Sequence, residues 1–370
     1  MKYLNEDQEL MLASIKEFVR NEIEPRVLEE MEIGNKCPLD LFDRARELGI
    51  SNMMLPEEYG GIGESMVMHV AVVEEFAKVN LALSIACPQN MIAAMMLRVG
   101  TPEQKEAYMD ELVNKGAGFS FTEPCAGSDA SGIQSTAVLD GDEWVINGQK
   151  TWISFMTASE WTLCSAKTEH GVSSFLLNTN SPGVTKSKPF HKLGMHGSDT
   201  GELFLDNVRV PKIALIGKEG KGLHNVLGVL DEARLAVAAA AVGLAQEALD
   251  KAVAYSKERV AFGRPIASFQ GLQWYAAEMA TKISDARALV YEAAQEYDAG
   301  LPFGVTSAKA KFFAANVAQE VTNKAVQMCG GMGLMDDFGM ERFYRDAKVC
   351  SITEGTDEIL KLVVARDVFA

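Results

Sequence analysis

The stretch STAVLDGDEWVINGQKTWIS, residues 135–154, decides the fold class of this chain of 370 residues. It contains two dipeptides that favour tight turns, Asp140-Gly141 and Asn147-Gly148, placed between strand-like runs. We interpret each dipeptide as the turn of a hairpin. The later stretches WTLCSAK, VSSFLLNT and GELFLDNVRVP continue the same pattern. The middle of the chain is therefore predicted to be a small antiparallel β domain.

Helical patterns lie on both sides of this block. Apolar residues such as Leu10, Ile15 and Phe18 repeat at helical spacing before it, with breaks at Pro38, at residues 56–63 and at Gly100. After it, residues 235–260, 272–300 and 306–329 predict three long helices, separated by GRP and LPFG. We expect an α+β fold that is mainly α, with an N-terminal α-helical domain at 1–118, a central β domain at 119–220 and a C-terminal four-helix-type bundle at 221–370.

Composition narrows the functional class. The 35 Lys and Arg against 51 Asp and Glu give a formal net charge of −16, which disfavours nucleic acid or an anionic membrane as partner. The six cysteines form no CxxC pair and the five histidines form no HExxH, so no metal site is predicted. A reducing, cytoplasmic compartment fits these cysteines best. The N-terminus resembles neither a signal nor a transit peptide, and we expect no apolar run long enough to cross a bilayer.

A Glu–Gly–Thr step occurs close to the C-terminus, in SITEGTDEILKLVVAR, residues 351–366. Thr356 is well placed to cap a helix that has Asp357 and Glu358 in its first turn. Glu354 then lies on the turn before the helix, and Gly355 beside it lets another group approach the backbone closely. The position alone allows two interpretations of Glu354: a surface carboxylate or a placed base.

Two further segments could bind a cofactor. In FSFTEPCAGSD, residues 119–129, small residues follow Pro124, and such loops present backbone N–H groups and a hydroxyl to phosphates. An ordinary turn before a strand explains the same residues. Trp152 and Ser154 could flank a flat cofactor or simply end a hydrophobic strand. There is no Walker A sequence, and the GGMG at 330–333 lacks the βαβ setting of a dinucleotide fingerprint.

Taken together, six stretches resemble the acyl-CoA dehydrogenase family of flavoproteins, and they occur in family order. The resemblance implies FAD, an acyl-CoA substrate, a role in fatty acid β-oxidation, transfer of electrons to an electron-transfer flavoprotein, and a homo-oligomer, expected to be a tetramer. The matching stretches are FTEPCAGSD, GQKTWIS, KLGMHGSDTGELFLDNVRVP, RVAFGRPIASFQ, AVQMCGGMG with ERFYRDAK, and TEGTDEILKLVVAR.

The resemblance also implies roles for individual residues. The expected flavin contacts are Phe119, Phe121, Thr122, Gly127, Ser128, Trp152, Ile153, Ser154, Thr356 and Glu358. The expected contacts to the adenylate half of FAD, across a subunit boundary, are Arg259, Gln270, Gln327, Gly330 and Gly331. The expected substrate contacts are Ser128, Asp231, Arg234 and Gly355.

In this family the usual base is the Glu of the Glu–Gly–Thr motif, so the resemblance implies that Glu354 is the catalytic base. It would take the proton α to the thioester while hydride leaves the β carbon for flavin N5. An apolar pocket that raises the carboxyl pKa suits this task. Some branches place the base at the position of Ala233, which cannot serve. Glu232 next to it is expected to point elsewhere, as a solvated or capping charge.

Several residues depart from the family pattern or stand outside it. Thr353 replaces the common Tyr before the base, which changes the acyl pocket. Cys125 replaces a small residue, and we interpret it as a small buried filler in preference to a redox group. His196 is expected to be a loop contact without a catalytic role. Met91, Met95 and Met96 are core residues on the simplest interpretation, or line an adaptable acyl pocket.

The alternatives form two groups. An enoyl-CoA reductase would run the same site backward, and an acyl-CoA oxidase would pass electrons to oxygen. A DNA-binding branch of the family has little dehydrogenase activity, but its basic C-terminal surface does not match a chain of net charge −16. A purely structural helical protein would have no need of six flavin-type motifs.

Overall fold

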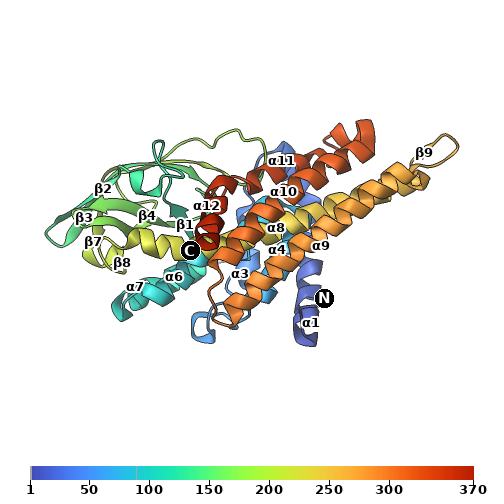
Figure 1. The fold of residues 1–370 in the computed structure, drawn as a ribbon. Helices are drawn as coiled ribbons and strands as arrows, with labels where there is room; N and C mark the ends of the chain where they lie inside the picture. The colour runs from blue at the N-terminus through green and yellow to red at the C-terminus, as the bar shows by residue number, and fades with distance from the viewer. Residues whose placement is uncertain (1, 89) are drawn as a thin grey trace.

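The computed structural model describes residues 2–88 and 90–370 and confirms the helical–β–helical order (Figure 1). The sheet lies at one end of the molecule, and the long C-terminal helices extend away from it toward the other end. The sheet is mixed, so the prediction of a purely antiparallel domain is wrong in part. Strand β1 (Ala117–Ser120) runs parallel to β4 (Trp161–Thr168), while most other neighbours are antiparallel.

In the N-terminal region, the predicted breaks coincide with the starts of helices. The Thr101 side chain accepts from the Gln104 N–H, and Pro102 occupies the first position of the following helix. Pro38 similarly precedes a helix that begins at Leu39. The helices of this region are α1 Glu6–Phe18, η1 Val19–Ile23, α2 Glu24–Arg26, η2 Val27–Ile33, α3 Leu39–Glu47, η3 Glu57–Tyr59, α4 Met66–Val79, α5 Leu81–Ala86, α6 Met91–Val99 and α7 Pro102–Lys115.

The sheet follows the order β6-β7-β3-β2-β4-β5-β8, with β1 added beside β4. Its inner face packs residues such as Trp144 and Phe175, whose rings meet edge to face at 5.3 Å. The remaining elements of this region are η4 Ala130–Gly132, β2 Thr136–Asp140, β3 Glu143–Ile153, β5 Gly171–Asn178, β6 Val184–Lys186, β7 Gly201–Pro211, η5 Lys212–Ala214 and β8 Leu215–Ile216.

Only one of the two predicted hairpin turns exists. Asp140 pairs with Glu143 across the Gly141 turn, which confirms the first. The second is wrong, because β3 continues through Asn147-Gly148 and forms an irregularity against β7 there. A Cβ on Gly148 would lie 2.1 Å from the Ser135 hydroxyl oxygen, so this glycine permits a close approach and makes no turn.

The C-terminal helices pack around α8 (Gly222–Glu258), whose alanine-rich centre is almost fully buried. Gly243 lies against the backbone of α4, where a Cβ would meet the Glu74 carbonyl oxygen at 2.2 Å. Helix α8 begins before the predicted residue 235, and α11 was not predicted as a helix. The other elements are β9 Val260–Ala261, β10 Arg264–Pro265, η6 Ile266–Ser268, α9 Gln270–Asp298, α10 Gly304–Cys329, η7 Gly330–Leu334, α11 Glu341–Cys350 and α12 Asp357–Val368.

One stretch corrects the expectation about membrane spans. By length and composition alone, Leu81–Val99 is apolar enough to cross a bilayer. It contains α5 and α6, and 53% of it is buried inside the protein. Residues such as Leu83 and Ala93 within it are fully buried, which is typical of a core segment as well.

Candidate active site

Glu354 lies on the turn that enters α12, as expected. The Thr356 side chain accepts from the Ile359 N–H, so the predicted cap is confirmed, and Asp357 and Glu358 occupy the first turn. Glu354 has a φ of 54° and Gly355 a φ of 99°. A left-handed conformation is costly for a residue other than glycine and persists only where its surroundings enforce it.

Two cations hold this turn from the helices beneath it. The Nε of Arg234 on α8 donates to the Glu354 carbonyl at 3.2 Å. The Nζ of Lys311 on α10 donates to the next carbonyl, that of Gly355, at 2.8 Å. Arg234 also pairs with Asp231 at 2.5 Å, and Lys311 lies 3.7 Å from Asp357. Two consecutive carbonyls are thus fixed by two buried positive charges.

The carboxyl of Glu354 has the electrostatic character that a base requires. Burial raises its pKa above the ordinary glutamate value, and the nearby charges of Arg234 and Lys311 partly oppose this rise. A carboxyl shifted toward neutrality both accepts and returns protons efficiently near physiological pH. The Gly355 position beside it leaves room, with Leu360 as the nearest group to a notional Cβ, at 3.6 Å.

The loop at 119–128 and the end of β3 form one unit. The Thr151 N–H donates to the Thr122 carbonyl at 2.9 Å, which ties the loop to the strand. Beneath it, the fully buried ammonium of Lys150 pairs with Glu123 at 2.6 Å. The structure therefore brings together the expected flavin contacts of both segments.

This unit presents a surface that fits a flat ring system. Trp152 is 62% exposed and lies edge to face with Phe190 at 5.1 Å. Open space surrounds the position of a Gly127 side chain, so a ligand can approach the loop backbone. Ser154 keeps its hydroxyl half-buried, 3.4 Å from that of Thr200. An exposed indole beside a loop of small residues is suited to an isoalloxazine ring and its phosphates.

The expected adenylate contacts lie elsewhere in the chain. Arg259 directly precedes β9, which lies at the end of the molecule far from the sheet (Figure 1). Within a single chain, the two sets of expected FAD contacts are therefore not brought together. All five of these residues are exposed: Arg259, Gln270, Gln327, Gly330 and Gly331.

Two expectations about side chains are wrong. Glu232 is 8% exposed and forms an ion pair with Arg98 of α6, so it is no solvated or capping charge. Cys125 is exposed and cannot be a buried filler. It lies on the surface of the loop, with its Sγ 3.9 Å from Glu123 Oε2. Met95 and Met96 are buried in a cluster with Phe121, as core residues.

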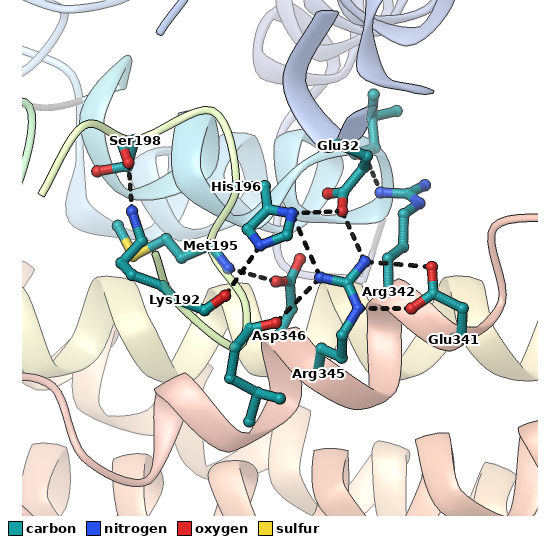
Figure 2. A network of polar contacts seen from close by, with 11 residues as sticks. Glu32, Lys192, Met195, His196, Ser198, Glu341, Arg342, Arg345 and Asp346 are labelled. Carbon is teal, nitrogen blue, oxygen red and sulfur yellow. Dashed lines mark hydrogen bonds and ion pairs between the residues drawn. The ribbon is translucent and has the colours of Figure 1, made fainter. Parts of the chain in front are cut away.

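His196 takes part in a network that joins three regions of the chain (Figure 2). Its Nδ1 lies 3.1 Å from Glu32 of η2, which also accepts from Arg345 of α11 at 2.7 Å. The Met195 N–H donates to Asp346 at 2.6 Å. Two of the recognised stretches, KLGMHGSD and ERFYRDAK, therefore dock onto each other. Since α11 leads into the Glu354 turn, this docking orients the turn relative to the sheet domain.

Sequence reasoning missed Lys311, Lys150 and Glu123. Each is a charged residue that is fully or nearly fully buried, and each holds a segment that carries expected site residues. The recognised stretches contain Lys150 and Glu123 but not Lys311, and nothing in the spacing showed which charges were buried. Among residues 2–88 and 90–370, no group of three or more His, Cys, Asp or Glu side chains is arranged to hold a metal ion.

Comparison with known proteins agrees with this architecture. Family models described as the N-terminal, middle and C-terminal domains of acyl-CoA dehydrogenase match residues 5–116, 118–208 and 220–369. Acryloyl-CoA reductase (NADH) of Anaerotignum propionicum is 42% identical over 99% of this chain and 95% of its own.

Two solved structures are close in shape. Butyryl-CoA dehydrogenase from Megasphaera elsdenii has a TM-score of 0.96 at 36% identity, covering 99% of both chains. A chain from a structural study of the electron transferring flavoprotein of Acidaminococcus fermentans, concerned with flavin-based electron bifurcation, has a TM-score of 0.95 at 40% identity. It covers 99% of this chain and 98% of its own.

Proposed function

The chain belongs to the acyl-CoA dehydrogenase family, and from this we propose that it catalyses the FAD-dependent α,β-dehydrogenation of an acyl-CoA thioester. The electrons pass on to an electron-transfer flavoprotein, and the reaction is of the type used in fatty acid β-oxidation. One observation carries the assignment of the site: Glu354, a carboxyl of raised pKa, lies on a left-handed turn fixed by two cations.

Glu354 is the base in this proposal. Its ionised carboxylate takes the α-proton. FAD, when bound, would accept the hydride that leaves the β carbon. The thioester lies against Gly355, where the absence of a side chain allows close approach. N–H groups of the turn are suited to the negative charge that develops on the thioester oxygen. Lys311 and Arg234 hold the two carbonyls of this turn and so fix its orientation toward the substrate.

The surface at 119–128 and at Trp152 to Ser154 holds the isoalloxazine end of FAD. The flavin contacts proposed there are Phe119, Phe121, Thr122, Gly127, Ser128, Trp152, Ile153 and Ser154, with Thr356 and Glu358 from α12. Asp231, Arg234 and Ser128 are proposed to face the CoA side. A surface hollow beside Asp231, lined by Lys309, Val363 and Asp367 among other residues, offers room for a ligand next to this residue.

The direction of the reaction has a second candidate. One relative is named acryloyl-CoA reductase, which is an argument for the reverse reaction. In that direction, the protonated Glu354 of this chain would return a proton to the α carbon. The same geometry serves both directions. Anaerobic mixing separates them in practice: bleaching of the flavin by butyryl-CoA supports dehydrogenation, and faster reoxidation of the reduced enzyme by crotonyl-CoA supports reduction.

Glu354→Gln tests the base. Removal of a positioned general base costs about 10²- to 10⁴-fold in rate. We expect the variant to bind FAD and butyryl-CoA, but to bleach its flavin slower by at least that factor in a stopped-flow experiment. A Gln variant that keeps near-native bleaching would show that the base is another group. A protein that cannot be reconstituted with FAD at all would overturn the catalytic function itself.

We further propose a homotetramer in the cytoplasm, with domains at 1–118, 119–220 and 221–370. The ranges matched by the family models support these limits. All six cysteines are free thiols in the described structure, which supports a reducing compartment. The separation of the two sets of expected FAD contacts within one chain supports an oligomer in which a second subunit supplies the adenylate contacts.

A further inference from the structure

We propose that Lys311 is a positioning residue for Glu354: its ammonium group holds the turn in place, and its positive charge sets the pH range in which Glu354 accepts a proton. This inference rests on the proposed function, because it takes Glu354 as the base. Neither the motif that contains Glu354 nor any expected ligand contact includes Lys311, which lies 43 residues earlier on α10 (354 − 311 = 43).

Lys311 is a buried cation whose main hydrogen bond is to the turn that carries Glu354. Its side chain is fully buried, and burying an ammonium group is costly unless it is paired and hydrogen-bonded. The contact to the Gly355 carbonyl at 2.8 Å is a direct hydrogen bond, whereas Asp357 lies 3.7 Å away. Burial lowers the pKa of Lys311, while Asp357, Cys350 and Glu354 favour its charged form. Its shortest contact is therefore with the turn that carries the base.

The turn needs an external support. Glu354 has a φ of 54°, and such a conformation is maintained by surrounding contacts, not by the residue itself. Arg234 holds the carbonyl of Glu354 and Lys311 holds that of Gly355. Loss of either contact releases one of the two peptide units that flank Gly355.

The two cations differ in how far their charges are neutralised. Arg234 makes a close pair with Asp231 at 2.5 Å on its own helix. Lys311 is only loosely paired with Asp357 of α12, whose other oxygen accepts from Asn316 at 2.9 Å. Lys311 is therefore the less neutralised of the two cations, although Arg234 has the larger effect on the pKa of Glu354. In the folded protein, burial raises the pKa of Glu354, and Arg234 and then Lys311 oppose that rise.

Two variants with opposite effects on charge test this proposal. Lys311→Met removes the positive charge and the donor, so the pKa of Glu354 should rise further and the acid limb of the pH–rate profile should move to higher pH. Asp357→Asn leaves Lys311 in place and removes the negative charge beside it, so the acid limb should move to lower pH. Asn can still accept from Asn316, which preserves the local hydrogen bond.

The measurement is anaerobic flavin bleaching of the FAD-loaded enzyme by butyryl-CoA across a pH series. For Lys311→Met we expect the bleaching rate to fall about tenfold more at the acid end of the series than at the alkaline end. A rise of one unit in the pKa of Glu354 reduces its ionised fraction about tenfold at acid pH. An infrared titration of the carboxyl, taken as the difference from Glu354→Gln at each pH, gives a second readout that needs no substrate.

The outcomes separate the two claims. If both variants move the profile in the same direction, or if neither alters the infrared titration, Lys311 is a structural residue only and this inference is wrong. If Glu354→Gln bleaches at a near-native rate, Glu354 is not the base, and the infrared titration still decides whether Lys311 controls its ionisation. If Lys311→Met does not fold, Lys311→Gln, which keeps a hydrogen-bond donor and removes the charge, decides the question by the same infrared titration.

Discussion

The raised pKa of Glu354, the proposed base, makes the stability of the protein depend on pH. Burial raises the pKa of Glu354 in the folded protein, so the folded state binds more protons than the unfolded chain as pH rises above about 4.3, the ordinary glutamate value. The free energy of unfolding therefore falls with rising pH through the folded pKa of this group. Below the unfolded value the carboxyl is neutral in both states and this contribution vanishes.

We accordingly expect Glu354→Gln to stabilise the FAD-loaded protein at pH 7 by roughly 1 kcal/mol, because the variant no longer buries a carboxylate charge. In the variant Arg234 keeps its partner Asp231, and Lys311 keeps the Gly355 carbonyl and Asp357, so neither buried cation is left alone. Thermal unfolding of both proteins at several pH values checks this, and the difference should shrink as the pH approaches 4. A variant that is less stable at neutral pH would show that the carboxylate contributes favourably in place.

At this scale the sequence predicts what a local pattern encodes. Glu354, its Gly355 neighbour and the Thr356 cap are adjacent residues, and helix-capping chemistry is local. Lys311 could not be predicted as part of the site, because only the packing of α10 against the turn brings it there. Cys125 shows the opposite error, since a residue type that is usually buried lies on the surface here.

Between elements, one buried ion pair connects the loop at 119–128 to β3. Lys150 donates to Glu123 at 2.6 Å and to the Phe121 carbonyl at 3.3 Å. The backbone N–H of Ser135 also donates to Glu123, at 3.0 Å. Removing one partner of a buried pair costs about 3–5 kcal/mol, because the other charge is left uncompensated.

Lys150→Met should therefore destabilise the protein by about that amount and weaken FAD binding, because the loop loses its support. The double variant Lys150→Met with Glu123→Gln should recover much of the stability, since no buried charge is left alone. Chemical unfolding measures the first effect, and the fluorescence of free flavin on dilution measures the second. Equal stability of the single and double variants would contradict the assignment of a coupled pair.

Element boundaries were predictable where caps and prolines stand, as at Thr101 and Pro38. Helix α11 was missed because it is short and strongly charged, and its inward face includes the buried Asp346. Asn147-Gly148 has the composition of a tight turn, but strand pairing with β2 and β7 on both sides overrides that local preference. The parallel pairing of β1 with β4 is set by distant partners that no local pattern reports.

Across the whole molecule, the three regions are joined by the network of Glu32, His196 and Arg345 (Figure 2). The order of the regions was predictable from composition, but this junction was not, because its charges come from three separate segments. The end of the molecule far from the sheet carries exposed apolar side chains instead of buried charges. Phe262 in the β9–β10 connection is 94% exposed, and Trp274 at the start of α9 is 59% exposed. Large apolar side chains in such positions favour a protein–protein contact.

Arg259 is an exposed positive charge at this end of the molecule. In the proposed oligomer Arg259 binds FAD across a subunit boundary, where its planar fork suits a phosphate. Arg259→Ala should then weaken FAD binding by about 10- to 100-fold, the range expected when a hydrogen bond to a charged group is lost. Arg264→Ala is the matched control: Arg264 is exposed on the same connection, and its guanidinium lies 4.3 Å from the Phe269 ring centre.

Equilibrium dialysis measures FAD affinity, and light scattering gives the oligomer size. Excess FAD should restore the activity and thermal stability of Arg259→Ala by mass action. An unaltered FAD affinity in this variant, or a fully active monomer that keeps FAD at high dilution, would refute the contact across a subunit boundary.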